Sequence, residues 1–127
     1  MKWYFKVLKN FVLFSGRARR KEYWMFVLTD IIISIVLMII ETMFYTDVIG
    51  YVTGNEMMIL VPIYYLITFL PRMAVSVRRL HDINQSGWRL LWMVVPLGAL
   101  VLLVDFSKKG NMGINDYGSD PKLSNNF

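Results

Sequence analysis

Three long apolar segments occupy half of this 127-residue chain, and they constrain its fold more than any other feature. They are Tyr23–Tyr45, Met57–Val77 and Gly87–Phe106, each 20 to 23 residues long. An α-helix of about 20 apolar residues spans the roughly 30 Å hydrocarbon layer of a bilayer. The sequence therefore predicts an all-α integral membrane protein, with three transmembrane helices in a single domain over residues 1–127.

Residues 2–14 predict an amphipathic helix ahead of the first apolar segment. Lys2, Lys6, Lys9 and Asn10 share one side of a helical wheel, and aromatic and aliphatic side chains cover most of the rest. A helix with a lysine stripe and aromatic residues suits the plane of the lipid headgroups. Alternatively, the same helix packs on the membrane bundle. Residues 107–127 are rich in Gly, Asn and Ser and predict an irregular tail.

The positive charges predict the orientation of the chain. Seven of the fourteen Lys and Arg residues precede the first apolar segment, and the connection 46–56 contains none. The next connection carries Arg78 and Arg79, with His81 beside them. Loops rich in Lys and Arg stay in the cytoplasm. We therefore expect a cytoplasmic N-terminus, with 46–56 on the outer side.

The third apolar segment leaves two topologies open. Three spans would place Lys108, Lys109 and Lys122 on the outer side, against the charge rule. Pro96-Leu97-Gly98 lies in the middle of the segment, and a re-entrant hairpin there would return the tail to the cytoplasm. Pro and Gly are also common in ordinary spanning helices. Three full spans are therefore the main expectation, and the hairpin is the alternative.

Two charged residues lie within the predicted spans. Asp30 follows the start of the first span by seven residues, and Arg72 precedes the end of the second by five. At 1.5 Å per residue, both lie roughly 8–10 Å from the cytoplasmic edge. We expect them to form an ion pair, because an unpaired buried charge is costly; the alternative is that each side chain reaches the headgroups separately. Asp30, Ser34 and Glu41 share one helix face, which we expect to point into the bundle.

Composition excludes several classes of site. The chain has no cysteine, so it contains neither a disulfide framework nor a thiolate metal site. His81 is the single histidine, whereas a zinc site needs three or four ligands. We predict no metal and no cofactor. The basic residues adjoin the apolar segments without a nucleic-acid recognition module, so no nucleic-acid partner is expected.

The charge pattern favours a membrane interaction or scaffold protein. Its basic cytoplasmic residues would bind anionic lipid headgroups, a second copy of the chain or another membrane protein. The candidate binding residues are Lys2, Lys6, Lys9, Arg17, Arg19, Arg20, Lys21, Arg78, Arg79, His81 and Asp82. One alternative is a subunit of an oligomeric transporter or channel that uses Asp30, Glu41 and Arg72. A weaker alternative is an enzyme that uses His81 and Asp82, and no catalytic residue is assigned.

Three separate motifs carry a family resemblance. They are Phe14–Trp24, Arg78–Asp82 followed by Ser86–Trp88, and Gly113–Pro121. In this order they resemble the domain of unknown function 805 family, and the resemblance covers nearly the whole chain. The opening Trp3-Tyr4 and Val7–Asn10 are similar to a group of small bacterial inner-membrane proteins in that family. The resemblance implies a helical domain in the bacterial inner membrane, and it supplies no activity. Arg72 after Pro71 departs from the family pattern.

Overall fold

The computed structural model describes residues 2–44 and 59–123 of the chain. Its helices, in chain order, are α1 (Lys2–Lys9), α2 (Arg20–Phe44), α4 (Leu60–Asp82), the 3-10 helix η2 (Gly87–Val94) and α5 (Gly98–Ser107). No strand occurs within these two ranges, apart from an isolated bridge between Asn115 and Gly118. The predicted all-helical class is therefore confirmed. The predicted external connection 46–56 lies outside the described residues.

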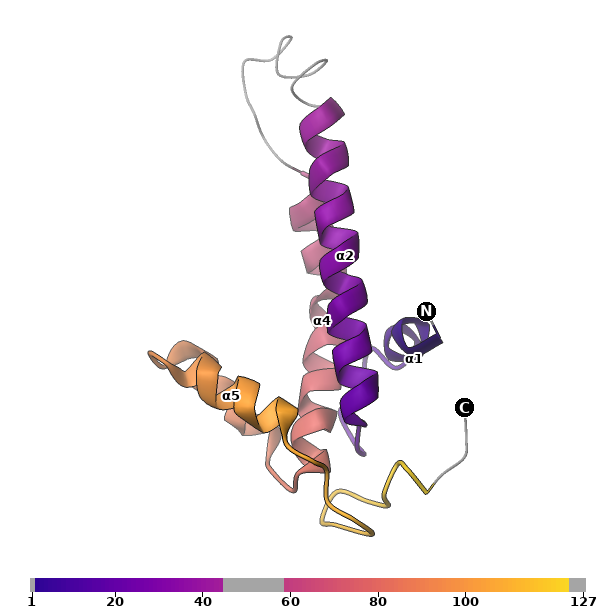
Figure 1. Cartoon of the computed structure of the whole chain (residues 1–127), viewed down its shortest axis with the longest axis vertical. Coiled ribbons are helices and arrows are strands. Elements are labelled where there is room, and N and C mark those ends of the chain that lie inside the picture. Colours follow the sequence, from indigo (N-terminus) through magenta and orange to yellow (C-terminus); the bar gives the residue numbers. More distant parts are fainter. Residues whose placement is uncertain (1, 45–58, 124–127) are drawn as a thin grey trace.

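Helices α2 and α4 form a long pair, with the other elements gathered at one end (Figure 1). They are 25 and 23 residues long, with mean hydropathies of 2.4 and 1.5 in their most apolar stretches. Both are long and apolar enough to cross a bilayer. Only 22% and 28% of the residues in those stretches are buried, so most of their apolar surface faces outward.

The third predicted span is divided in two. Val95 is extended and Leu97 has a left-handed backbone (φ 63°), so the chain turns between η2 and α5. Pro96 explains the break, because proline cannot donate a backbone hydrogen bond and disfavours helix in the residue before it. A Cβ on Gly98 would lie 1.7 Å from the Trp92 carbonyl oxygen, so this turn needs glycine. The expectation of one continuous helix over 87–106 is therefore wrong.

The two halves pack against each other as a hairpin. Asp105 of α5 is buried, and its carboxylate lies 2.7 Å from Arg89 Nη2 of η2 and 2.6 Å from Lys108 Nζ. At rises of about 2.0 and 1.5 Å per residue, each arm is roughly 15 Å long. That is about half the thickness of a bilayer core, so neither arm can cross it.

Two predicted helix boundaries need correction. The first helix ends at Lys9 and does not continue to residue 14. Helix α4 continues through Asp82, so Arg78–Asp82 is its last turn and not a loop. Asn84, at φ 57°, ends α4 in a Schellman motif, in which the amides of Asn84 and Gln85 bond to carbonyls of the last turn. Arg78–Asp82 is thus held on a rigid element.

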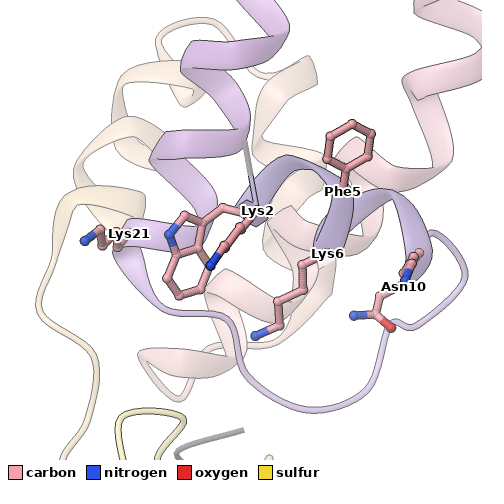
Figure 2. A pocket seen from close by; sticks show the side chains of 7 residues that line it. Lys2, Phe5, Lys6, Asn10 and Lys21 are labelled. Carbon is pink, nitrogen blue, oxygen red and sulfur yellow. The ribbon is translucent and has the colours of Figure 1, made fainter. Parts of the chain in front are cut away.

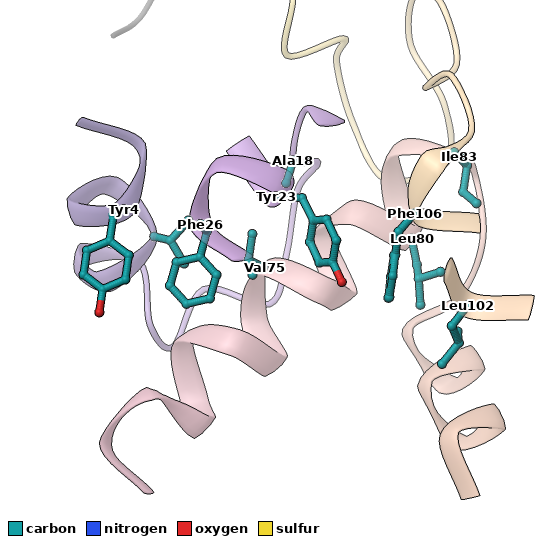
Figure 3. Close-up of a cluster of buried hydrophobic side chains, with 10 residues drawn as sticks. Tyr4, Ala18, Tyr23, Phe26, Val75, Leu80, Ile83, Leu102 and Phe106 are labelled. Carbon is teal, nitrogen blue, oxygen red and sulfur yellow. The ribbon is translucent and has the colours of Figure 1, made fainter. Parts of the chain in front are cut away.

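A compact apolar core joins the clustered elements (Figure 3). Tyr4 of α1 stacks on Phe26 of α2 with ring centroids 5.4 Å apart. Tyr23 of α2 contacts Phe106 at the end of α5, with centroids 4.5 Å apart. Val75 and Leu80 of α4, together with Leu102 of α5, also belong to this core. Helix α1 therefore packs on the bundle, which was the alternative to a free position among the headgroups.

Candidate functional site

A buried carboxylate between two arginines lies at the clustered end of the helix pair. Asp82 Oδ1 lies 3.0 Å from Arg17 Nη2, and Asp82 Oδ2 lies 2.6 Å from Arg79 Nη1. All three side chains are at most 2% exposed. We call Arg17, Arg79 and Asp82 the Asp82 cluster. Removing one partner of a buried ion pair leaves an uncompensated charge, so these three residues depend on one another.

The free donors of the two guanidinium groups hold the tail in place. Arg17 Nη1 donates to the carbonyl oxygens of Gly113, at 2.6 Å, and Gly118, at 3.3 Å. Arg79 Nε donates to the Phe106 carbonyl oxygen at 3.1 Å. Further bonds run from Arg17 to the Asn111 carbonyl, from Arg79 to the Lys108 carbonyl and from the Asn111 amide to the Asp82 carbonyl. Residues 106–118 are therefore held by hydrogen bonds between their backbone and the Asp82 cluster.

Gly110 packs directly against the Asp82 carboxylate. A Cβ added there would lie 1.9 Å from Asp82 Oδ2, much closer than atoms can approach. We expect Gly110→Ala to lower the free energy of unfolding by about 1–3 kcal/mol, the usual cost of overpacking. Unfolding in mixed detergent micelles, followed by circular dichroism, measures this change. Ser119→Ala on the exposed side of the tail is the control, and an equal effect of the two substitutions would contradict the close packing.

His81 also contacts the tail. Its ring stacks on Tyr117 with centroids 3.9 Å apart and planes 5° apart. Its Nδ1 lies 3.0 Å from the Gly16 carbonyl oxygen, and Asn115 Nδ2 donates to the His81 carbonyl oxygen at 2.8 Å. The carboxylate of Asp82 faces the arginines of the cluster. The His81 and Asp82 side chains thus make separate contacts, and an enzyme based on this pair gains no geometric support.

Residues 120–122 of the tail lie close to the start of α2. Arg19 Nε donates to the Pro121 carbonyl oxygen at 2.6 Å. The Lys122 amide donates to Asp120 Oδ1 at 2.9 Å, and this bond holds the pKa of Asp120 below its usual value. Asp120 therefore stays charged at neutral pH. Its negative charge lies near Arg17, whose field also lowers the pKa of Asp120.

A second group of charges links α4, α2 and α1. Glu22 is buried and accepts from Arg78 Nη1 at 2.9 Å. Its other oxygen lies 3.3 Å from Lys6 Nζ. Arg78 Nε and Nη2 are buried without a hydrogen-bond partner among the described residues. Among the described residues, Glu22 is therefore the main partner that compensates the charge of Arg78.

Asp30 and Arg72 lie in direct contact, as the sequence predicted. Arg72 Nη2 is 2.6 Å from Asp30 Oδ2. Tyr64 OH donates to Asp30 Oδ1 at 2.8 Å, and Tyr4 OH lies 3.0 Å from Tyr64 OH. The sequence did not predict the role of the two tyrosines, because Tyr4 belongs to a separate helix and Tyr64 lies among apolar residues. Together these four side chains form a partly buried hydrogen-bonded group between α1, α2 and α4.

Glu41 has a different role from the one considered in the sequence. Its Oε1 accepts from the amides of Ile59 and Leu60, the latter at 2.7 Å, and its Oε2 accepts from Val61 at 3.3 Å. These are the free amides at the start of α4, where the positive end of the helix dipole favours a carboxylate. Glu41 of α2 therefore caps α4 at the opposite end of the pair from the Asp82 cluster.

An open basic groove lies between α1 and the start of α2 (Figure 2). We call it the α1 groove, and its volume is about 920 Å³. The Lys6 and Asn10 side chains extend on one side of α1, and Phe5 extends on the other. The lining residues are Lys2, Trp3, Phe5, Lys6, Lys9, Asn10 and Lys21. The groove therefore combines four ammonium groups with two aromatic rings.

The predicted binding residues fall into two groups. Arg17, Arg78, Arg79, His81 and Asp82 are buried and take part in internal contacts. Lys2, Lys9, Arg20 and Lys21 are exposed, and Lys6 and Arg19 are partly exposed. The exposed group gathers at α1 and the first turn of α2. Of the predicted binding residues, this exposed group is the one that an external ligand can reach.

Two similar proteins come from Escherichia coli. Inner membrane protein YhaI of Escherichia coli (strain K12) is 48% identical over 127 residues, which cover 99% of this chain and 100% of the relative. Inner membrane protein YhaH of the same strain is 46% identical over 124 residues, or 97% and 98% of the two chains. The family model described as "Protein of unknown function (DUF805)" matches residues 11–119. No solved structure matches the chain.

Proposed function

The chain belongs to the DUF805 family of proteins of unknown function, and from that premise we propose that it is a small interaction or scaffold protein that binds anionic lipids of the inner membrane. One observation carries the proposal. The fold uses the buried arginines internally but leaves Lys2, Lys9, Arg20 and Lys21 exposed on one side of the molecule. Lysine and arginine near an anionic leaflet each contribute about 1 kcal/mol of attraction.

We propose a topology with two spans, α2 and α4, and a re-entrant hairpin formed by η2 and α5. The tail contacts Arg17 and Arg79, so it lies at the same end of the helix pair as the N-terminus. Thirteen of the fourteen Lys and Arg residues then belong to that end, Arg72 being the exception, and 45–58 contains none. This distribution supports a cytoplasmic location for both termini.

The exposed apolar side chains of the hairpin also support this arrangement. Trp88 is 79% exposed, Val94 85% and Leu97 77%. Lipid contact at these positions would remove a large apolar surface from water. A hairpin inserted part of the way into the cytoplasmic leaflet covers these side chains without crossing the bilayer.

The transporter alternative has no specific observation in its favour. Asp30 and Arg72 bind each other, and Glu41 binds the start of α4. These contacts satisfy the three charges within a single chain. A stabilising role accounts for them without a water-filled path.

We expect anionic lipid to be enriched around the protein. Spin-labelled phosphatidylglycerol should associate about fivefold more strongly than spin-labelled phosphatidylcholine at low salt, the ratio expected from one nearby lysine. At 1 M salt the screening length falls to about 3 Å, so the preference should nearly vanish. Electron paramagnetic resonance of the reconstituted protein measures both ratios. Equal association of the two lipids at low salt would exclude this function.

A further inference from the structure

We infer that the α1 groove holds one anionic glycerophospholipid, with its phosphate among Lys2, Lys9 and Lys21 and its glycerol and upper acyl chains against Trp3 and Phe5. This inference rests on the proposed function and deepens it. A general attraction of anionic lipid to the basic surface needs no fixed site. Binding in the groove is more specific, because it requires one lipid at one defined site.

The charges of the groove are unbalanced. Lys6 is compensated, because its ammonium lies 3.3 Å from Glu22 and over the Trp3 ring at 5.3 Å from the ring centroid. Within residues 2–44 and 59–123, no carboxylate lies at ion-pair distance from Lys2, Lys9 or Lys21. Like charges on one helix face repel each other, so an anion between them is favoured.

In the proposed topology, the position of α1 along α2 puts this charge beside the lipid phosphates. Tyr4 stacks on Phe26, which lies six residues beyond the start of α2, or roughly 9 Å along the helix at 1.5 Å per residue. Amphipathic helices on membranes lie roughly 5–10 Å into the boundary between headgroups and acyl chains. The lysine side of α1 therefore faces the headgroups when Tyr4 is buried in the bundle.

The lining and the size of the groove favour a ligand with an apolar part. Trp3 and Phe5 line it together with the lysines, and Phe5 is 57% exposed. A volume of about 920 Å³ is within the usual range for sites that bind a small organic molecule. A free phosphate would leave the aromatic side chains in contact with water. A phospholipid covers them and also neutralises the lysines.

Native mass spectrometry of the delipidated, full-length protein tests the inference with two matched double variants. Lys2→Gln/Lys21→Gln removes two charges from the groove, and Lys109→Gln/Lys122→Gln removes two exposed charges from the tail. We expect the unaltered protein to bind one phosphatidylglycerol before any other. The groove variant should bind this first lipid about 25-fold more weakly, at about fivefold per lysine, and the tail variant should be nearly unchanged.

Three other results would each overturn a different part of the proposal. An equal loss in both variants would show diffuse attraction and overturn the groove, while the proposed function would stand. No preference of the unaltered protein for phosphatidylglycerol over phosphatidylcholine would remove the proposed function itself. Binding of inorganic phosphate or glycerol 3-phosphate at the same concentrations would identify a free-phosphate site and overturn the assignment to lipid. Circular dichroism of both variants checks that the helices are intact.

Discussion

Asp82→Asn should lower the free energy of unfolding by about 3–5 kcal/mol, the cost of leaving buried charge without its partner. The substitution keeps the size of the side chain but removes the charge that Arg17 and Arg79 share. Both guanidinium groups stay buried, and their remaining bonds go to backbone carbonyls of the tail. Asp82 also holds the two guanidinium groups in position, so without its charge we expect these bonds to weaken and the tail to detach in the same variant. Unfolding in mixed micelles measures the stability, and limited proteolysis of the tail measures the detachment.

Asp116→Asn is the matched control for this experiment. Asp116 is exposed, lies in the tail and accepts one bond from Asn84 Nδ2 at 3.0 Å. The substitution removes the same formal charge, and exposed substitutions of this kind usually change stability by less than about 0.5 kcal/mol. If the two variants lost equal stability, Asp82 would have no special place in the fold.

The Asp82 cluster gives a physical meaning to the three sequence motifs. Arg17 comes from the first, Arg79 and Asp82 from the second, and the carbonyl oxygens of Gly113 and Gly118 from the third. The motifs meet as one polar assembly beneath the helix pair. The buried residues of these motifs fasten the tail, whereas the exposed Lys21 of the first motif belongs to the groove that we propose binds lipid.

Hydropathy predicted the two long helices because their signal is local and nearly continuous. The pairing of Asp30 with Arg72 was also predictable, since the distance of each residue from the same end of an antiparallel helix pair can be counted along the sequence. The hairpin was harder to predict, because proline and glycine such as Pro96 and Gly98 are also common in spanning helices. What distinguishes it is the left-handed Leu97 and the ion pair of Asp105 with residues on both sides, and neither has a clear sequence signal.

The burial of the arginines could not be predicted from charge patterns. A run such as Arg17–Lys21 indicates a surface next to a membrane. Arg17 instead bonds to carbonyl oxygens 94 to 101 residues away. Every residue type has a backbone carbonyl, so its sequence position carries no information about such a bond. Lys2, Lys9 and Lys21 followed the simpler expectation and remain exposed.

Three single-cysteine variants should report on which side of the membrane each position lies, since the chain has no cysteine of its own. We expect Asn55→Cys to react with a membrane-impermeant maleimide in intact spheroplasts. Ser15→Cys and Lys109→Cys should react only after the membrane is disrupted. The physical reason is that the hairpin returns the tail to the side of the N-terminus, where the Asp82 cluster binds it. Mass-tag labelling followed by electrophoresis measures the reacted fraction.

The position of Lys109→Cys decides between the two topologies. With three complete spans, Lys109→Cys would react in intact spheroplasts, like Asn55→Cys. With two spans and a hairpin, it would react only after disruption, like Ser15→Cys. The first result would separate Arg17 from Gly113 by the whole bilayer, although the structure places their atoms 2.6 Å apart. A label on Lys109→Cys in intact spheroplasts would therefore overturn the hairpin and the Asp82 cluster together. Labelling of all three variants after disruption is the control for thiol accessibility.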